Sequence, residues 1–115
     1  MEKHPWHNHR YWELFSSYQD DPKYKETINK LISIGDRLWV ACRNEDLTTC
    51  RQLAHEFMKV QDEAGELGAA DTEPRAAMAH IVRIARNGEP WDILVEGEET
   101  SVEGWFRWGE IALGY

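Results

Sequence analysis

The sequence has no long apolar segment. None of its apolar runs approaches the ~20 residues that cross a lipid bilayer. Residues 1–5, Met-Glu-Lys-His-Pro, also lack the apolar core of a secretion signal. With 115 residues, of which 42% are hydrophobic and 30% charged, the chain has the composition of a folded domain rather than a disordered one. We therefore expect a single soluble, cytoplasmic domain over residues 1–115 that makes no contact with a membrane.

Basic side chains are scarce, with 13 lysines and arginines against 21 acidic residues and a formal net charge of −8. Unspecific nucleic-acid binding needs Lys and Arg at the phosphates, so this charge balance argues against it. The deficit is greatest in residues 89–115, which hold seven acidic residues and a single arginine. Such a segment suits a partner protein with a basic surface. A solvated face that only keeps the protein in solution is the simpler alternative.

The chain has only two cysteines, Cys42 and Cys50, which are eight residues apart. A disulfide framework in a small secreted protein usually has more cysteines and a signal peptide. A zinc site would have a Cys-x-x-Cys pair or histidines at ligand spacing, and His55 is the nearest candidate for a third ligand. The spacing therefore predicts two reduced and buried thiols.

Catalytic motifs are also missing: the sequence has no Gly-rich phosphate loop, no nucleophile elbow and no Ser-His-Asp set. His55-Glu56 begins like the zinc-protease motif His-Glu-x-x-His, but Lys59 stands at the second ligand position. A further group of histidines near the N-terminus has no carboxylate or thiolate at a diagnostic spacing; its members are His4, His7 and His9. We expect no catalytic residue, no metal ligand and no cofactor.

Two weaker patterns keep an enzymatic alternative open. Glu63 and Glu66 form one Glu-x-x-Glu on a predicted helix, as magnesium-dependent hydrolases use, but a second acidic pair is not obvious. Arg75 and His80 have the spacing of the arginine–histidine pair of helical ribonucleases, with Ala76 where a polar residue usually follows. The alternative function is therefore a small helical nuclease or hydrolase that uses one of these pairs.

The spacing of the apolar residues predicts four or five helices. The clearest pattern lies in residues 22–43, where apolar or small residues recur at intervals of three and four. These residues are Tyr24, Ile28, Leu31, Gly35, Leu38 and Cys42. Other helices are expected over 5–19, from 44 to about 64, from 72 to about 87, and over 101–113. The fold class is therefore mostly α, a compact bundle in which 22–43 is the longest helix.

The segment 91–95, Trp-Asp-Ile-Leu-Val, has the chemistry of a strand but no second strand to pair with. It is either a short helical turn or an edge strand that pairs with another chain. In 101–113, Glu103, Arg107 and Glu110 recur on one helical face, and apolar residues fill the opposite face. A helix therefore fits 101–113 better than a strand, with Thr100 and Glu103 as a capping box.

Six Trp, four Tyr and three Phe are many large aromatic residues for a chain of this length. A small domain leaves much of its surface exposed, so some of these residues should lie in a protein–protein contact rather than in the core. We place this contact in the last third of the chain. The aromatic centre is predicted at Trp91, Trp105, Phe106 and Trp108, and the acidic rim at Glu98, Glu99 and Glu103.

These observations favour a non-catalytic protein-binding regulator. It would inhibit or sequester another protein, such as a transcription factor, a toxin or a defence complex. A homodimer is also expected, from the surplus of aromatic residues, the heptad-like apolar stripe of 24–42 and the unpaired segment 91–95. A structural or assembly subunit is a further alternative.

Overall fold

The computed structural model describes residues 18, 20–66, 74–98 and 100–114, without the side chains of 64–66. The described residues form helices and turns and no strand, which confirms the mostly α prediction. The helices are α2 (Lys25–Arg43), α3 (Leu47–Glu66), α4 (Pro74–Ala85), α5 (Asp92–Val95) and α6 (Val102–Ala112). The helix expected over 5–19 falls almost entirely outside the described residues. None of the described helices is both long and apolar enough to cross a membrane.

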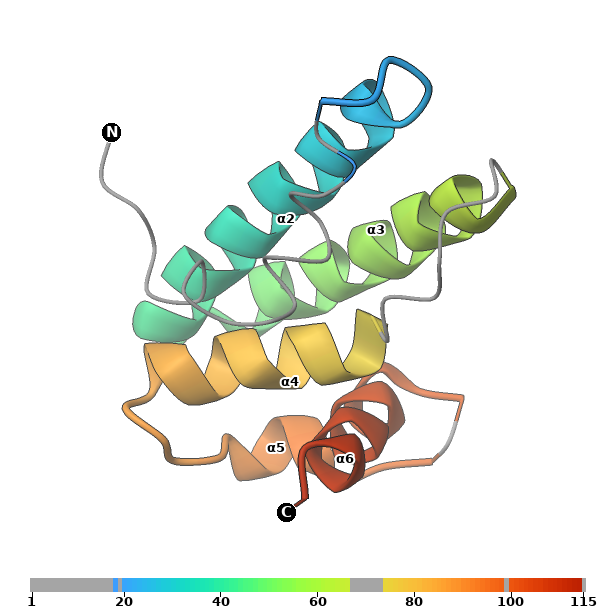
Figure 1. The fold of residues 1–115 in the computed structure, drawn as a ribbon. Helices are drawn as coiled ribbons and strands as arrows, with labels where there is room; N and C mark the ends of the chain where they lie inside the picture. Colours follow the sequence, from blue (N-terminus) through green and yellow to red (C-terminus); the bar gives the residue numbers. More distant parts are fainter. Residues whose placement is uncertain (1–17, 19, 67–73, 99, 115) are drawn as a thin grey trace.

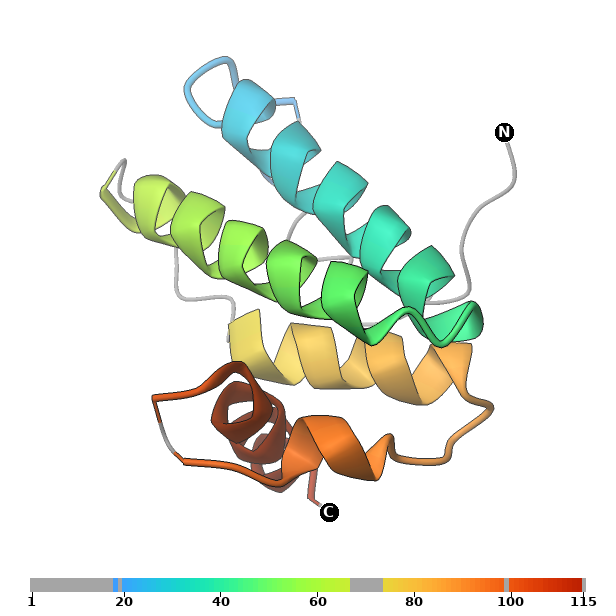
Figure 2. The same ribbon diagram turned by 180° about the vertical axis from the view of Figure 1, so that it is seen from behind.

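The helices form three layers (Figure 1). Helices α2 and α3 run antiparallel, α4 crosses beneath them, and α5 and α6 lie on the other side of α4. The view from behind shows the same order (Figure 2). Helix α4 is therefore the layer that joins the α2–α3 hairpin to the C-terminal helices.

The turn between α2 and α3 depends on Asp46. Its backbone N–H donates to the carbonyl oxygen of Ala41, and Glu45 before it has a left-handed φ of 54°. The Asp46 carboxylate accepts the backbone N–H of Thr49 at 3.1 Å and the Thr49 hydroxyl at 2.6 Å, as an N-cap residue does. This cap begins α3 at Leu47, three residues after the predicted start, and α3 has 20 residues against 19 in α2. The expectation that residues 22–43 form the longest helix is therefore wrong, because α3 is one residue longer than α2.

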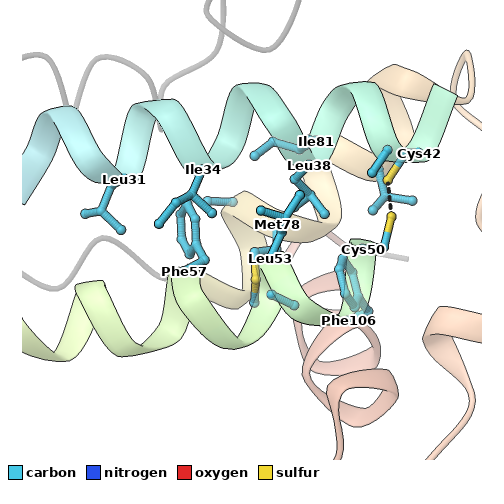
Figure 3. Packing of buried hydrophobic residues seen from close by; sticks show 14 of the residues in the cluster. Leu31, Ile34, Leu38, Cys42, Cys50, Leu53, Phe57, Met78, Ile81 and Phe106 are labelled. Atoms are coloured by element: carbon cyan, nitrogen blue, oxygen red, sulfur yellow. Dashed lines mark hydrogen bonds between the residues drawn. The ribbon is translucent and has the colours of Figure 1, made fainter. Parts of the chain in front are cut away.

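The core lies between the hairpin and α4 (Figure 3). Ile28, Leu31 and Leu38 are buried as their spacing predicted, whereas Tyr24 and Trp39 are only partly buried at its edge. Four of the buried residues of α4 are alanines, whose short side chains let neighbouring helices approach closely. The buried residues of α4 are Ala76, Ala77, Met78, Ala79, Ile81, Val82 and Ala85.

The segment 91–95 is a helical turn, so the first of its two alternatives is confirmed and the edge strand that pairs with another chain is wrong. The N–H of Leu94 donates to the carbonyl oxygen of Trp91, and the N–H of Glu96 to that of Asp92. These bonds within the turn satisfy groups that an edge strand would offer to a partner chain. The turn also buries Leu94 completely, which explains why its apolar residues did not need a second strand.

Helix α6 approaches α4 at Gly109 and Glu110. A Cβ atom on Gly109 would collide with the backbone oxygen of Arg75, so only glycine permits this approach. Glu110, predicted on the polar face of the helix, is only 2% exposed. Its carboxylate accepts two bonds of 3.0 Å from Nε of Arg83 and one of 2.7 Å from Nη2. Arg83 also donates to the carbonyl oxygen of Gly88 and so ties the α4–α5 connection to the same pair.

We expect Arg83→Ala to lower the free energy of unfolding by about 3–5 kcal/mol, because it leaves the buried carboxylate of Glu110 without its partner. Urea unfolding followed by circular dichroism measures the change. Arg107→Ala removes the same charge from the exposed face of α6 and should change the free energy by less than about 0.5 kcal/mol. A loss below ~1 kcal/mol for Arg83→Ala would show that water replaces the arginine at Glu110.

Candidate protein-binding surface

Large apolar side chains are exposed mainly on the C-terminal helices. Among the described residues four of them are highly exposed: Val40 (44%), Ile93 (47%), Trp108 (45%) and Ile111 (51%). Three of the four lie on α5 and α6, which pack against each other. Trp108 and Ile111 are three residues apart on α6 and are therefore neighbours on one helical face. We call Ile93, Trp108 and Ile111 together the α5–α6 surface.

Helix α6 has apolar residues on two sides. Val102, Phe106 and Gly109 recur at intervals of four and three and face the core, where all three are buried. Trp108 and Ile111 lie on the opposite side and remain in solvent. The sequence predicted the outward position of Trp108, but Phe106 is only 1% exposed, so its assignment to the contact surface is wrong. The spacing of Phe106 from Val102 and Gly109 explains why it points toward α4.

Trp91 and Trp105 are neither fully buried in the core nor highly exposed to solvent. Both are partly buried and pack against the core. The ring of Trp91 lies under the guanidinium of Arg86 at 5.3 Å, and the ring of Trp105 meets His55 edge-on at 5.1 Å. Each tryptophan therefore has contacts within the fold and presents only part of its ring to a partner.

Glu103 is bound within the molecule. Its carboxylate accepts a hydrogen bond of 2.7 Å from Nε of Arg51 on α3, and the Nη2 of Arg51 completes an ion pair. Burial alone would raise the pKa of Glu103, but bonds from its own backbone N–H and from Arg51 outweigh it. The charges of Arg51 and His55 act in the same direction, and the pKa falls below its ordinary value. Glu103 therefore holds α6 against α3 and is less available as a rim contact.

The exposed carboxylates of the predicted acidic region lie on α5 and on the segments before and after it in the chain. Glu98 is exposed as predicted, and its backbone oxygen accepts the Ser101 hydroxyl at 2.6 Å. Ser101, and not the predicted pair of Thr100 and Glu103, caps α6 by accepting the N–H of Gly104 at 3.0 Å. Glu99 lies outside the described residues. Other exposed carboxylates of this region are Glu89, Asp92 and Glu96.

The sequence reasoning missed Ile93 and Ile111. For the segment that contains Ile93 the sequence left a helical turn and an edge strand open, so the exposed side of the turn was not predicted. A signal for Ile111 was present, because Trp108, Ile111 and Ala112 recur at intervals that form a second apolar stripe on 101–113. An amphipathic helix with two apolar stripes has more apolar surface than one core can cover.

The residues of the enzymatic alternative lie on α3 and α4. Arg75 is exposed and His80 is half-buried on α4, and a separation of five residues turns them about 140° apart around the helix axis. Glu63 is exposed on α3, and the side chain of Glu66 is outside the described part. Within the described residues, no three His, Cys, Asp or Glu side chains are grouped as metal ligands.

The groove between α2 and α3 has a mixed lining. It has a volume of about 700 Å³, and its walls include Lys30, Lys59 and Glu63. Arg37 on α2 and Glu56 on α3 form an ion pair of 3.6 Å and also line the groove. Because both cationic and anionic side chains line the walls, the groove favours neither an anionic nor a cationic ligand.

Comparisons with protein-family models, with curated proteins and with solved structures find no match for this chain. The functional assignment therefore depends on the chemistry of its own surface. The α5–α6 surface has three of the four highly exposed large apolar side chains of the described residues, with exposed carboxylates on α5 and the segments next to it.

The ion pair of Glu103 with Arg51 should make stability depend on pH. A lowered pKa means that the pair stabilises the fold above the ordinary pKa of about 4.5 and that this contribution is lost as the pH falls through the folded value. Because Arg51 is about half exposed, we expect Glu103→Gln to lower the free energy of unfolding by less than ~1 kcal/mol at pH 7. At pH 3 the difference should shrink toward zero. Urea unfolding at both pH values measures it.

Arg51→Gln is the matched control, because it removes the other partner. The double variant should lose little more than either single variant. An equal loss for Glu103→Gln at pH 3 and pH 7 would contradict the role of the ionised pair.

Proposed function

We propose that this protein is a non-catalytic protein-binding regulator that covers a surface of another protein and so inhibits or sequesters it. The proposed partner is a protein such as a transcription factor, a toxin or a component of a defence complex. The observation that carries the proposal is the exposure of Trp108 beside Ile111 on a helix that is otherwise fixed to the core.

The chemistry of the α5–α6 surface indicates the chemistry of its partner. Tryptophan contributes most to binding where a pocket removes it completely from water, at the centre of an interface. Carboxylates at the rim contribute mainly to the rate and specificity of association. The partner should therefore have an apolar pocket for Trp108, with Lys or Arg around it to face Asp92, Glu96 and Glu98.

Rigidity supports the same function. Three contacts hold α6 before any partner arrives: Glu110 with Arg83, Glu103 with Arg51, and Gly109 against the backbone of Arg75. A binding face that is already ordered loses little conformational entropy on association. More of the energy of burying Trp108 is then available for affinity.

A homodimer through the same surface is the alternative that the exposed apolar residues also favour. Contact around a two-fold axis places each patch against its own copy, which brings the two acidic rims close together. Like charges at this distance repel, so self-association should strengthen as salt screens them. Binding to a basic partner should weaken with salt, and this difference separates the two proposals. Sedimentation equilibrium at low and high salt measures self-association directly.

We also propose that the protein works in the cytoplasm. Cys42 and Cys50 are both free, and a compartment that keeps thiols reduced would keep them so.

We expect Trp108→Ala to weaken partner binding by at least ~2 kcal/mol, or about 30-fold in Kd, because it removes the central side chain of the contact. The native protein and the variant are each immobilised on a resin and exposed to an extract of the host cell. The retained partner is then purified, and its Kd for each protein is measured by isothermal titration calorimetry. Val40→Ala is the matched control, since Val40 is equally exposed but lies on α2.

Both variants should unfold at nearly the same urea concentration as the native protein. Support requires one stoichiometric partner that the native protein and Val40→Ala retain and Trp108→Ala loses. Equal retention by all three proteins would move the binding site away from the α5–α6 surface.

Glu98→Lys should slow association with the same partner several-fold at low salt, because it reverses a charge on the acidic rim. The effect should shrink as added salt shortens the Debye length from about 10 Å at 0.1 M to about 3 Å at 1 M. Asp62→Lys makes the same change of charge on the exposed side of α3 and should have a smaller effect. Stopped-flow measurement of the association rate tests both. An equal slowing by the two variants would show that net charge, and not the rim, controls the rate.

A further inference from the structure

The two cysteines of the chain meet inside the core. Cys42 lies in the last turn of α2 and Cys50 in the first turn of α3, and both are almost completely buried. Their sulfur atoms are 3.3 Å apart, and one thiol donates a hydrogen bond to the other (Figure 3). Both thiols are free.

The hairpin turn brings the two sulfur atoms together. Asp46 closes the turn by its bond to Ala41 and by capping α3 through Thr49. The inner faces of α2 and α3 then meet immediately beyond the turn, with one cysteine on each. A disulfide has a sulfur–sulfur distance of about 2.05 Å, so a short approach of two side chains already in contact would form it.

A pocket lies next to Cys42. Cys42 lines a pocket of about 280 Å³ at the ends of α2 and α4, and Cys50 does not contribute to this lining. Arg43 and Arg86 line the same pocket, and the Nε atom of Arg86 is buried without a hydrogen-bond partner. A small oxidant that enters the pocket therefore meets Cys42 first.

The hydrogen bond with Cys50 raises the pKa of the Cys42 thiol, and burial adds to this effect. The positive charge of Arg86 acts in the opposite direction but does not outweigh them. The Cys42 thiol is therefore protonated at neutral pH. Since the thiolate is the nucleophile, the reaction of Cys42 should be slow at neutral pH and faster as the pH rises.

We propose that Cys42 and Cys50 form an oxidative modification site at which a peroxide converts the two thiols into an intramolecular disulfide. The sulfur of Cys42 attacks one peroxide oxygen: an S–O bond forms, the O–O bond breaks, and the departing hydroxide takes up the thiol proton as water. The sulfur of Cys50 then attacks the sulfenic sulfur of Cys42. An S–S bond forms, the S–O bond breaks, and a second water leaves with the Cys50 proton. Two thiols are oxidised and one peroxide is reduced to two waters.

The disulfide would link the last turn of α2 covalently to the first turn of α3. It would restrict the unfolded chain more than the folded one, in which the two sulfur atoms already touch. The oxidised protein should therefore resist heat better than the reduced protein.

The first test uses the native protein with hydrogen peroxide at pH 8. We expect a monomer that has lost two hydrogens by intact mass, has no thiol that titrates in denaturant, and regains both thiols with dithiothreitol. Its Tm should exceed that of the reduced protein by at least about 4 °C. Two free thiols after the treatment, or a disulfide between two chains, would overturn the proposal.

The order of the two steps is tested with single variants that circular dichroism shows to be folded. Cys50→Ala should accumulate a sulfenic acid at Cys42, which a 1,3-diketone traps, whereas Cys42→Ala should leave Cys50 unlabelled. The reverse pattern would overturn the assignment of Cys42 as the first to react.

The role of Arg86 is tested in the native cysteine background. Arg86→Gln should slow disulfide formation and shift its pH profile upward, because the variant lacks the charge that favours the Cys42 thiolate. Arg107→Gln on the exposed face of α6 is the matched control and should leave the rate unchanged. An unchanged pH profile in Arg86→Gln would contradict this positioning role.

Discussion

The ion pair of Arg83 with Glu110 is the contact on which the C-terminal half depends. It is almost completely buried and carries three hydrogen bonds, so it fixes both the rotation of α6 and its position along α4. Gly109, the residue next to Glu110, lets the two backbones come close enough for this pair to form. The direction in which Trp108 points follows from the same rotation, because the side chains of one helix turn together.

Helix α6 shows how a small domain keeps apolar side chains exposed without losing its fold. One apolar side completes the core through Val102 and Phe106, and the other leaves Trp108 and Ile111 in water. Contacts from α3 and α4 hold the helix in this orientation, with Arg51 and Arg83 as the two cations. Interactions elsewhere on the same helix therefore offset the unfavourable free energy of exposing these apolar side chains.

Periodicity predicted the helices well, because apolar spacing records which face is buried. It placed the main residues of α2 in the core and identified α6 as a helix with an apolar face. It failed where a distant residue decides the outcome. Glu110 follows a polar pattern with Glu103 and Arg107, but Arg83 on another helix provides the charge that allows its burial.

The candidate surface was predicted in part. Trp108 is exposed as expected, whereas Phe106 was counted as surface although its own spacing matches the buried face. Residues 91–95 have strand-forming side chains, so local preference could not decide between a strand and a helical turn. The burial of Leu94, which accompanies the turn, depends on the packing of the whole chain. The contact between Cys42 and Cys50 also needed the turn at Asp46, which spacing alone does not specify.

The order of the helices has a consequence for how quickly the chain reaches its folded state. Three of the six main helix pairs join helices that follow one another in the chain: α2 with α3, α3 with α4, and α5 with α6. Local contacts of this kind close short loops, and helical domains rich in them fold in about microseconds to milliseconds. A newly made chain would then expose its core only briefly. The encounter with a partner, and not folding, would set how soon such a protein acts.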